Sequence, residues 1–430
     1  MSRRITGEQP ATAKPVGSAR SEEMASISTK AGLRRIAMLA WRDLDDPEAG
    51  GSELHAHRIA SCWAAAGIDV VMRTSAVAGS HETLQRDGYT VVRRSGRYRV
   101  FVDAPVQICA GRRGPLGRVD GLVEIWNGMP FMSPLWWRGP KVVFLHHVHG
   151  EMWQMVLPPH LAAAGSAFES RVAPVFYRRT RVVTLSDSSR QEIIGSLGMR
   201  PELVSVVPPG IDSRFRPFPA GPDGPAGPDG PAGPDGRDDG ASGIGGKADH
   251  PLIVAVGRLV PVKRFDRLIA AARPLAARCP GVEIVIVGEG YERPALEAAI
   301  EQAGVGGTAR LAGHLSADEL VRLYQRAWVL VSMSAREGWG MTVTEAAACG
   351  TPAVVSRIAG HLDAVEHGVT GLLVDGEHQL VEALDRVLSD SVLRADLAKA
   401  ALCRAQRYCW EATALLTLQL LAREALAVSS

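Results

Sequence analysis

The chain has 430 residues, enough for two domains with cores of their own, and its hydrophobic content of 46% and charged content of 22% are ordinary for a globular protein. The net charge is only +2 and no helical stretch carries a dense basic stripe, so we expect no nucleic-acid partner. Residues 31–215 hold 22 Lys and Arg against 17 Asp and Glu, which suits an acidic acceptor or an anionic membrane surface. A scattered, solvated set of charges is the simpler alternative.

The cysteines and the N-terminal residues indicate in which cellular compartment the protein is expected. The six cysteines form no C-x-x-C pair and no metal-binding spacing, so we expect reduced thiols. No apolar run approaches the ~20 residues of a membrane span. Residues 1–30 are polar, lack the apolar core of a signal peptide and are expected to form a disordered tail. We therefore expect a cytoplasmic protein and leave peripheral contact with the inner face of the membrane open.

Residues 31–215 are predicted to form a first domain of alternating strands and helices. Residues 35–40 give a strand, a loop ends in Gly50-Gly51, and a helix follows from about Ser52, a suitable N-cap. The G-x-G-x-x-G fingerprint is absent, and two loop glycines can also mark a plain turn. The acidic run at residues 43–46 permits a metal-binding interpretation, but such loop acids are usually solvated and we predict no metal.

Three histidines follow the strand predicted for residues 141–145. His146, His147 and His149 could form a metal site, but no cysteine or carboxylate at ligand spacing supports one. Further strands are predicted at residues 181–186 and 203–207, and a proline-rich exit ends the domain. From Gly221 to Gly236 glycine then recurs at every third position, too briefly for a convincing collagen helix. Residues 216–249 are therefore predicted to be an extended, disordered linker.

Residues 250–409 are predicted to form a second domain of the same class. The strand at residues 252–256 runs into Gly257-Arg258, and Lys263 follows five residues later. Two cations at the end of a buried strand can bind a diphosphate, although surface cations at a helix start are the simpler alternative. Further strands are predicted at residues 283–287 and 309–313.

The central stretch is a strand, a glycine loop and a helix. Residues 327–333 read as a buried strand, Glu337 precedes Gly338-Trp339-Gly340, and a helix runs from Thr342 to Cys349. Free N–H groups at Met341, Thr342 and Val343 would favour a phosphate. Thr342 with Glu345 also fits a capping box, which would make Glu345 structural.

Glu337 and Glu345, followed by Gly350-Thr351-Pro352, resemble the E-x7-E signature of the retaining glycosyltransferases of family 4. The resemblance covers roughly residues 34–425 and implies the GT-B fold, in which two Rossmann-like doubly wound α/β domains face a central cleft. It also implies that a helix over residues 410–430 crosses back to brace the first domain. Where the family usually has Gly-Gly…Glu, this chain has Ala359-Gly360 and Asp363, which puts the contacts of that loop in doubt.

The resemblance assigns roles to the conspicuous residues. Arg258 and Lys263 would stabilise the leaving diphosphate without a catalytic metal, and Glu337 would hold the sugar hydroxyls. Glu345 would accept the ribose hydroxyls. His146, with His147 as the second choice, would lie near the donor sugar and the acceptor. Gly51, Gly340 and the start of the helix at residues 341–343 would contact the donor.

The resemblance implies transfer of a hexose from a UDP- or GDP-linked sugar to an acceptor hydroxyl, with no cofactor besides the donor. The acceptor could be a saccharide, a lipid-linked molecule or a natural product, because no loop carries a readable code for it. A nucleotide-sugar epimerase, a phosphorylase-type enzyme and a non-catalytic sugar-nucleotide-binding subunit are the alternatives.

Overall fold

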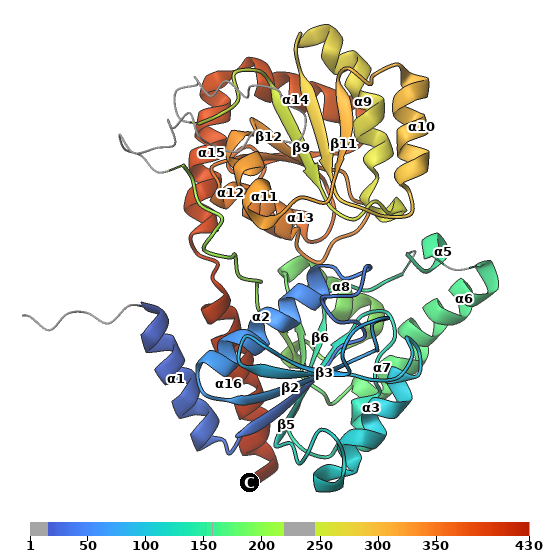
Figure 1. Ribbon diagram of the computed structural model, residues 1–430, viewed down its shortest axis with the longest axis vertical. Coiled ribbons are helices and arrows are strands. Elements are labelled where there is room, and N and C mark those ends of the chain that lie inside the picture. Colours follow the sequence, from blue (N-terminus) through green and yellow to red (C-terminus); the bar gives the residue numbers. More distant parts are fainter. Residues whose placement is uncertain (1–15, 151, 157, 219–245, 430) are drawn as a thin grey trace, which may run out of the picture.

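The computed structural model of the protein describes residues 16–150, 152–156, 158–218 and 246–429. Within these residues, two α/β domains lie one above the other, and the C-terminal helix returns to the first domain (Figure 1). The prediction of two domains built on mainly parallel, doubly wound sheets is confirmed. None of the helices in the described residues has the length and apolar character needed to cross a membrane.

The first domain contains an eight-stranded sheet with the order β3-β4-β2-β1-β5-β6-β7-β8. All neighbours pair in parallel except β3 and β4, which form an antiparallel edge. The strands are β1 (Arg35–Leu39), β2 (Asp69–Thr74), β3 (Thr83–Arg86), β4 (Tyr89–Arg93), β5 (Gly121–Trp126), β6 (Lys141–Leu145), β7 (Val182–Thr184) and β8 (Val204–Val206). The inner strands are almost continuous apolar runs because helices cover both faces of the sheet.

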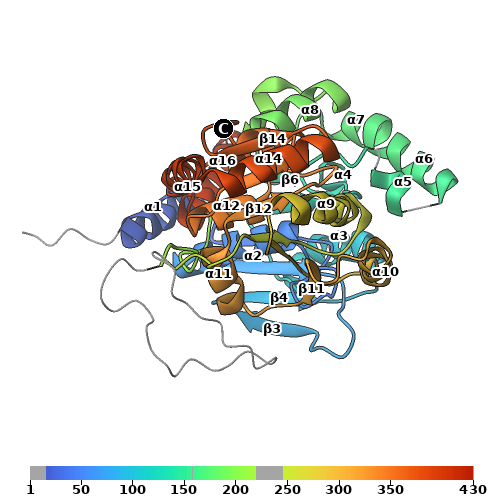
Figure 2. The same ribbon diagram turned by 90° about the horizontal axis from the view of Figure 1, so that it is seen from above.

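The helices of the first domain are α2 (Gly51–Ala65), α3 (Val100–Cys109), α4 (Ser133–Trp136), α5 (Met152–Val156), α6 (Pro159–Ala167), α7 (Ala173–Tyr177) and α8 (Asp187–Leu197). A π-helical turn, Phe168–Val172, joins α6 to α7. Seen from above, α5 and α6 project beyond the rest of the first domain at one edge of the molecule (Figure 2). We did not predict β3, β4, α3 or the helices from α4 to α7 from the sequence.

The second domain contains a six-stranded, fully parallel sheet with the order β11-β10-β9-β12-β13-β14. Its strands are β9 (Leu252–Val256), β10 (Glu283–Val287), β11 (Ala309–Gly313), β12 (Val329–Ser332), β13 (Ala353–Ser356) and β14 (Gly371–Val374). Its helices are α9 (Phe265–Arg278), α10 (Arg293–Ala303), α11 (Ala317–Arg326), α12 (Met341–Ala348), α13 (His361–Ala364), α14 (Glu377–Ser389) and α15 (Ser391–Ala405).

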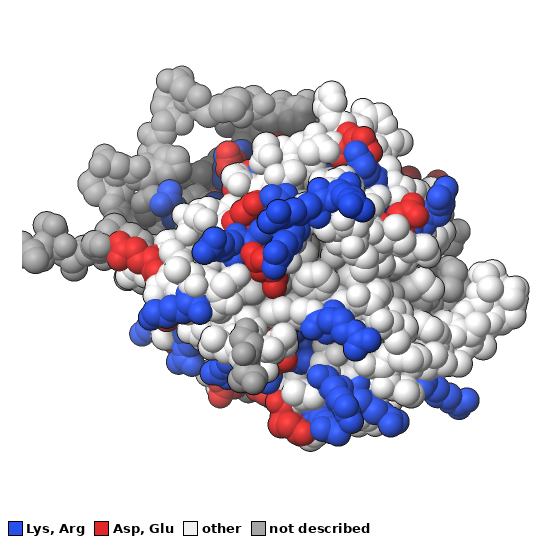
Figure 3. All heavy atoms as spheres, turned by 90° about the horizontal axis from the view of Figure 1, so that it is seen from below, with Lys and Arg blue, Asp and Glu red and all other residues white. Residues whose placement is uncertain are grey.

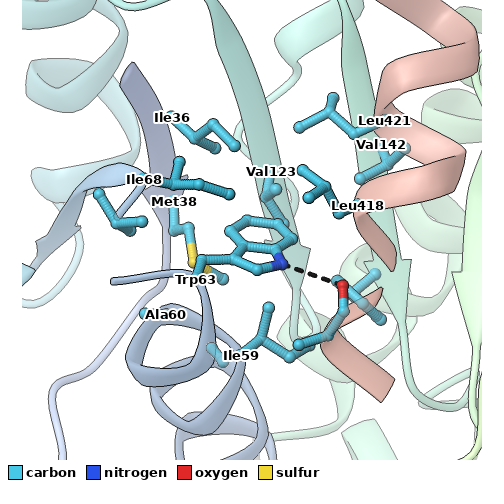
Figure 4. Packing of buried hydrophobic residues seen from close by; sticks show 14 of the residues in the cluster. Ile36, Met38, Ile59, Ala60, Trp63, Ile68, Val123, Val142, Leu418 and Leu421 are labelled. Carbon is cyan, nitrogen blue, oxygen red and sulfur yellow. Dashed lines mark hydrogen bonds between the residues drawn. The ribbon is translucent and has the colours of Figure 1, made fainter. Parts of the chain in front are cut away.

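The last helix, α16 (Trp410–Ser429), belongs to the core of the first domain. It packs against α2 and β6, and Leu418 and Leu421 are fully buried there. The indole N–H of Trp63 in α2 donates to the carbonyl of Ala414 at 2.9 Å (Figure 4). The burial of these large side chains against α2 anchors α16 to the first domain.

The N-terminal segment corrects one prediction. Residues 16–30 form α1 (Val16–Lys30), which packs against α16, so the expectation of a disordered tail is wrong for this part. Met24 is fully buried, and the segment has no strong helical periodicity that could have revealed it, because the surface that orders it is supplied by α16. Residues 1–15 and most of the predicted linker, residues 219–245, lie outside the described residues.

Candidate functional site

The candidate site lies where the switch points of the two sheets face each other. In the first sheet the strand order reverses between β1 and β5, and in the second between β9 and β12. Open α/β sheets bind ligands beyond the carboxyl ends of the strands at such points. The loop after β1 leads to Gly50, the loop after β9 carries Arg258 and Lys263, and the loop after β12 carries Glu337. The sheet topology therefore brings the predicted residues to one cleft.

Helix α12 begins at Met341 without a side-chain cap. Gly340 occupies the N-cap position with a φ of 101°, a conformation that glycine adopts readily. The alternative capping box between Thr342 and Glu345 therefore does not form. The N–H of Val343 already donates to the carbonyl of Gly340 at 3.0 Å. Met341 and Thr342 are thus the better-placed backbone donors for an anion.

Lys263 and Glu337 form an ion pair between the loops that follow β9 and β12. Lys263 ends a short 3-10 turn, Pro261–Lys263, and its ammonium contacts Oε1 of Glu337. The hydroxyl of Ser334 donates to the same oxygen at 2.8 Å. Burial raises the pKa of Glu337, but the charge of Lys263 and these hydrogen bonds outweigh burial and lower the pKa overall. Glu337 is therefore ionised and held in one orientation.

Arg258 reaches from the second domain to the glycine loop of the first. Its guanidinium donates to the carbonyl of Glu48 at 3.2 Å, and a Cβ on Gly50 would lie 3.4 Å from its Nε. Burial lowers the pKa of Arg258, and the nearby charge of Arg42 lowers it further. Two guanidinium groups at such a position favour an anion between the domains.

The start of α2 faces the start of α12. A Cβ on Gly51 would lie 3.4 Å from the sulfur of Met341, so the two helix N-termini approach across the cleft. The prediction of Ser52 as the N-cap is wrong, because Gly50 takes that position. The carboxylate of Glu53 accepts hydrogen bonds from the N–H of Gly50 at 2.9 Å and from the hydroxyl of Ser52 at 2.8 Å. The side chain of Ser52 therefore binds Glu53 and does not cap the helix. Both helix dipoles point positive charge at the same space.

The three histidines face different surroundings. The imidazole of His146 is buried against α2, where its Nε2 lies 3.2 Å from Nδ1 of His55. Burial lowers the pKa of His146 to about 4. Burial also lowers the pKa of His147, and the charges of Arg336 and Lys263 contribute. The ring of His147 stacks on that of His149 with the ring centroids 5.0 Å apart, whereas the carbonyl and Cβ of His146 face Gly338.

Glu345 lies on α12, one turn beyond the start of the helix. The hydroxyl of Tyr324 donates to its carboxylate at 3.3 Å. Burial raises the pKa of Glu345 to about 7, and the negative charge of Asp212 also raises it. This carboxyl group therefore changes its protonation near neutral pH, in contrast to the ionised Glu337.

The acidic loop after β1 is not simply solvated. Asp43 is fully buried, forms an ion pair with Arg86 at 2.6 Å and lies 3.1 Å from Nε2 of His57. The prediction of solvated acids is therefore wrong for Asp43. Arg42, which the sequence analysis missed, is buried between Glu48 and Glu53 at 3.1 and 3.2 Å. Its place three residues after the end of β1 was the signal that could have indicated it.

Close contacts join the two domains beside the cleft. The carboxylate of Asp363 accepts the N–H groups of Asp187 at 3.1 Å and Ser188 at 3.2 Å, and so caps α8 of the first domain. These are the contacts of the loop that departs from the family pattern. A Cβ on Gly338 would lie 2.5 Å from the carbonyl oxygen of His146, so only glycine permits this approach.

Comparison with known proteins agrees with this geometry. The family model for "Glycosyltransferase Family 4" matches residues 49–215, and the model for "Glycosyl transferases group 1" matches residues 242–403. The D-inositol 3-phosphate glycosyltransferase of Pseudarthrobacter chlorophenolicus is 27% identical over 423 residues, which cover 90% of this chain and 94% of that protein.

Solved structures show the same fold. A sucrose-phosphate synthase from Thermosynechococcus elongatus superimposes with a TM-score of 0.74 at 21% identity, over 92% of this chain and all of that one. The HepE protein of Anabaena, solved with UDP and glucose, superimposes with a TM-score of 0.66 at 20% identity, over 92% of this chain and 99% of that one. The fold is thus GT-B, and the chain belongs to the family 4 glycosyltransferases.

Proposed function

We propose that this glycosyltransferase moves a hexose from a UDP- or GDP-linked donor to an acceptor hydroxyl, with retention of the anomeric configuration. The observation that supports the proposal most is the ion pair between Lys263 and Glu337, which lies beside the start of α12. Arg258 completes the group from the same loop as Lys263. Cations for a diphosphate and a carboxylate for sugar hydroxyls thus occupy one cleft.

The arriving donor would rearrange the ion pair. Its diphosphate would attract the ammonium of Lys263 and the guanidinium of Arg258, while the N–H groups of Met341 and Thr342 bind a phosphate oxygen. Glu337 would then accept hydrogen bonds from the sugar hydroxyls and orient the anomeric carbon. As the glycosidic bond breaks, the two cations neutralise the charge that develops on the diphosphate, and this role requires no metal.

Retention is best explained by attack on the face from which the diphosphate leaves. A double displacement would need a carboxylate nucleophile in the first domain. Glu53 is engaged by the N–H of Gly50 and by Arg42, and Glu169 is engaged by the N–H groups of His149 and Gly150. The departing phosphate oxygen would therefore take the proton of the acceptor hydroxyl.

The remaining residues bind the ends of the donor. Glu345 would accept the ribose hydroxyls, and His146, with His147 as the second choice, would lie near the sugar and the acceptor. The name of the inositol phosphate relative makes a phosphorylated polyol one acceptor to test, and a lipid-linked saccharide is another. A cytoplasmic enzyme in peripheral contact with the inner face of the membrane would suit the second.

A non-catalytic sugar-nucleotide-binding subunit is the main competing proposal. Such a protein could bind a nucleotide without retaining both leaving-group cations and the sugar-orienting Glu337. An epimerase would keep the phosphate site but would need no acceptor. Release of free sugar and transfer to an acceptor therefore distinguish these candidates.

Calorimetric titration with UDP and GDP, with and without EDTA, tests the site directly. We expect one nucleotide to bind without a metal and Arg258→Ala to weaken binding at least tenfold. Arg310→Ala is the matched control, because Arg310 is 57% exposed and pairs with Glu283 at the far edge of the sheet. Failure of both nucleotides to bind would refute the proposal.

A further inference from the structure

The first domain exposes apolar side chains between arginines on three neighbouring helices. Val102 and Val106 of α3 and Leu135 of α4 are each more than half exposed, although such side chains are usually buried. We call the whole set the α3–α7 face. Its members are Val102, Val106, Leu135, Val175 and Phe176, with Arg99, Arg112, Arg113, Arg138, Arg178 and Arg179.

The α3–α7 face is continuous. Helix α3 contacts α4, and α4 contacts α7. Between them lie Trp136 and Trp137, both half-buried. Their indole N–H groups donate to the carbonyls of Phe131 at 2.8 Å and Pro140 at 3.0 Å. The polar edges of the rings are therefore satisfied inside the protein, and apolar ring surface remains beside the exposed valines.

Positive charge dominates this part of the chain. Residues 98–180 contain nine Lys and Arg against five Asp and Glu. Glu124 and Glu169 are buried, and Asp120 accepts the N–H groups of Arg34 and Arg35. Asp103 on α3 lies 3.8 Å from Arg99, and Glu151 is outside the described residues. Figure 3, which views the first domain from below, shows basic side chains with some acidic ones among them, beside areas without charge. The exposed charge that accompanies the apolar side chains is thus mainly cationic.

We propose that the α3–α7 face docks on the surface of an anionic phospholipid bilayer. Apolar side chains can enter the acyl boundary while the surrounding arginines bind lipid phosphates. A second copy fits less well, because a twofold contact would place the arginines of one copy against those of the other. A neutral protein partner would leave the cationic surplus without a counterpart.

The docking surface is linked to the cleft. Helix α7 continues from the π-helical turn in which Glu169 accepts the N–H groups of His149 and Gly150. The indole of Trp153 donates to the same carboxylate at 3.0 Å. The loop after β6 is therefore tied to the helix that would lie on lipid. This arrangement favours an acceptor that stays anchored in the membrane while its hydroxyl enters the cleft. This inference about the acceptor rests on the proposed transferase function.

Vesicle sedimentation of the full chain tests the proposal. We expect binding to phosphatidylcholine vesicles with 30% phosphatidylglycerol, weaker binding at 0.5 M salt, and at least tenfold weaker binding to pure phosphatidylcholine. Arg112→Ala with Arg113→Ala should weaken binding about 25-fold, about fivefold for each arginine. Val102→Ser with Val106→Ser should weaken it on the order of tenfold. Val392→Ser, equally exposed on α15 of the second domain, is the matched control and should have no effect.

The outcomes separate this inference from the proposed function. Nucleotide affinity and melting temperature should be unchanged in every variant, which shows that the cleft and the fold are intact. If the protein binds nucleotide as expected but does not bind vesicles, the docking proposal is overturned and the proposed function is not. The same holds if all variants bind vesicles equally well. Light scattering could instead show a dimer that dissociates when Val102→Ser and Val106→Ser are combined. That result would assign the α3–α7 face to contact with a second copy and would also overturn the docking proposal.

Discussion

Replacement of Lys263 by methionine tests the central ion pair most sharply. Methionine keeps much of the length and the apolar volume of the lysine but removes the charge. Glu337 would keep its hydrogen bond from Ser334 at 2.8 Å and lose its cation. The variant therefore separates the charge of Lys263 from its packing.

Two magnitudes follow from the structure. Breaking a buried ion pair by removing one partner costs about 3–5 kcal/mol, but Lys263 and Glu337 keep 22% and 18% of their side chains exposed. Water screens the remaining charge, so we expect a loss of about 1–3 kcal/mol in the free energy of unfolding. The kcat/KM should fall about 10²- to 10³-fold, because one cation that stabilises the leaving diphosphate is lost.

The assays are thermal unfolding and initial rates with the donor that binds. Because Lys263 lowers the pKa of Glu337, its removal should move the acidic limb of the kcat/KM profile to higher pH. Adding Glu337→Gln should recover stability without recovering activity. Lys399→Met, an exposed change on α15, is the control. A kcat/KM within threefold of the unmodified enzyme would refute the assignment of Lys263 to the diphosphate.

Four further predictions use other features of the fold. Nucleotide affinity should fall as the pH drops through about 7, because protonation of Glu345 removes the charge that would strengthen its hydrogen bonds from the ribose hydroxyls; titration of Glu345→Gln should show no such dependence. Gly338→Ala should lower kcat severalfold in rate assays, since its Cβ would force the domains apart at His146. Substituting His146 by alanine should reduce kcat/KM about 10²-fold or more, whereas the same change at His147, the second choice, should have a smaller effect. Met24→Ala should cost about 2–4 kcal/mol in chemical denaturation, because Met24 is fully buried between α1 and the core, and should leave KM unchanged.

The strands of both sheets were largely predictable because a buried parallel strand is a short, nearly continuous apolar run. Prediction from sequence placed β9, β10 and β12 within a residue or two of their observed ends. The loops that carry Arg258 and Glu337 were equally readable, since glycines directly after such strands mark the ligand-binding edge. Region 73–118 was missed because β3 is polar and α3 contains a proline.

Side-chain partners were harder to predict. Thr342 and Glu345 have capping-box spacing, yet Gly340 takes the N-cap position and Glu345 meets Tyr324 instead. Asp43 stands in a loop sequence typical of solvated acids but is buried by Arg86, which comes from a strand 43 residues away. Such outcomes depend on residues that are distant in the sequence, so local spacing cannot decide them.

By itself the sequence determined the two-domain architecture and the loops from which Arg258, Lys263 and Glu337 come, because strand patterns and glycine turns act over a few residues. Only the tertiary structure decided that the imidazole of His146 meets that of His55, and that residues 16–30 become a helix. His55 and α16 supply the surfaces that make those choices, and both reach their partners only when the whole chain has folded.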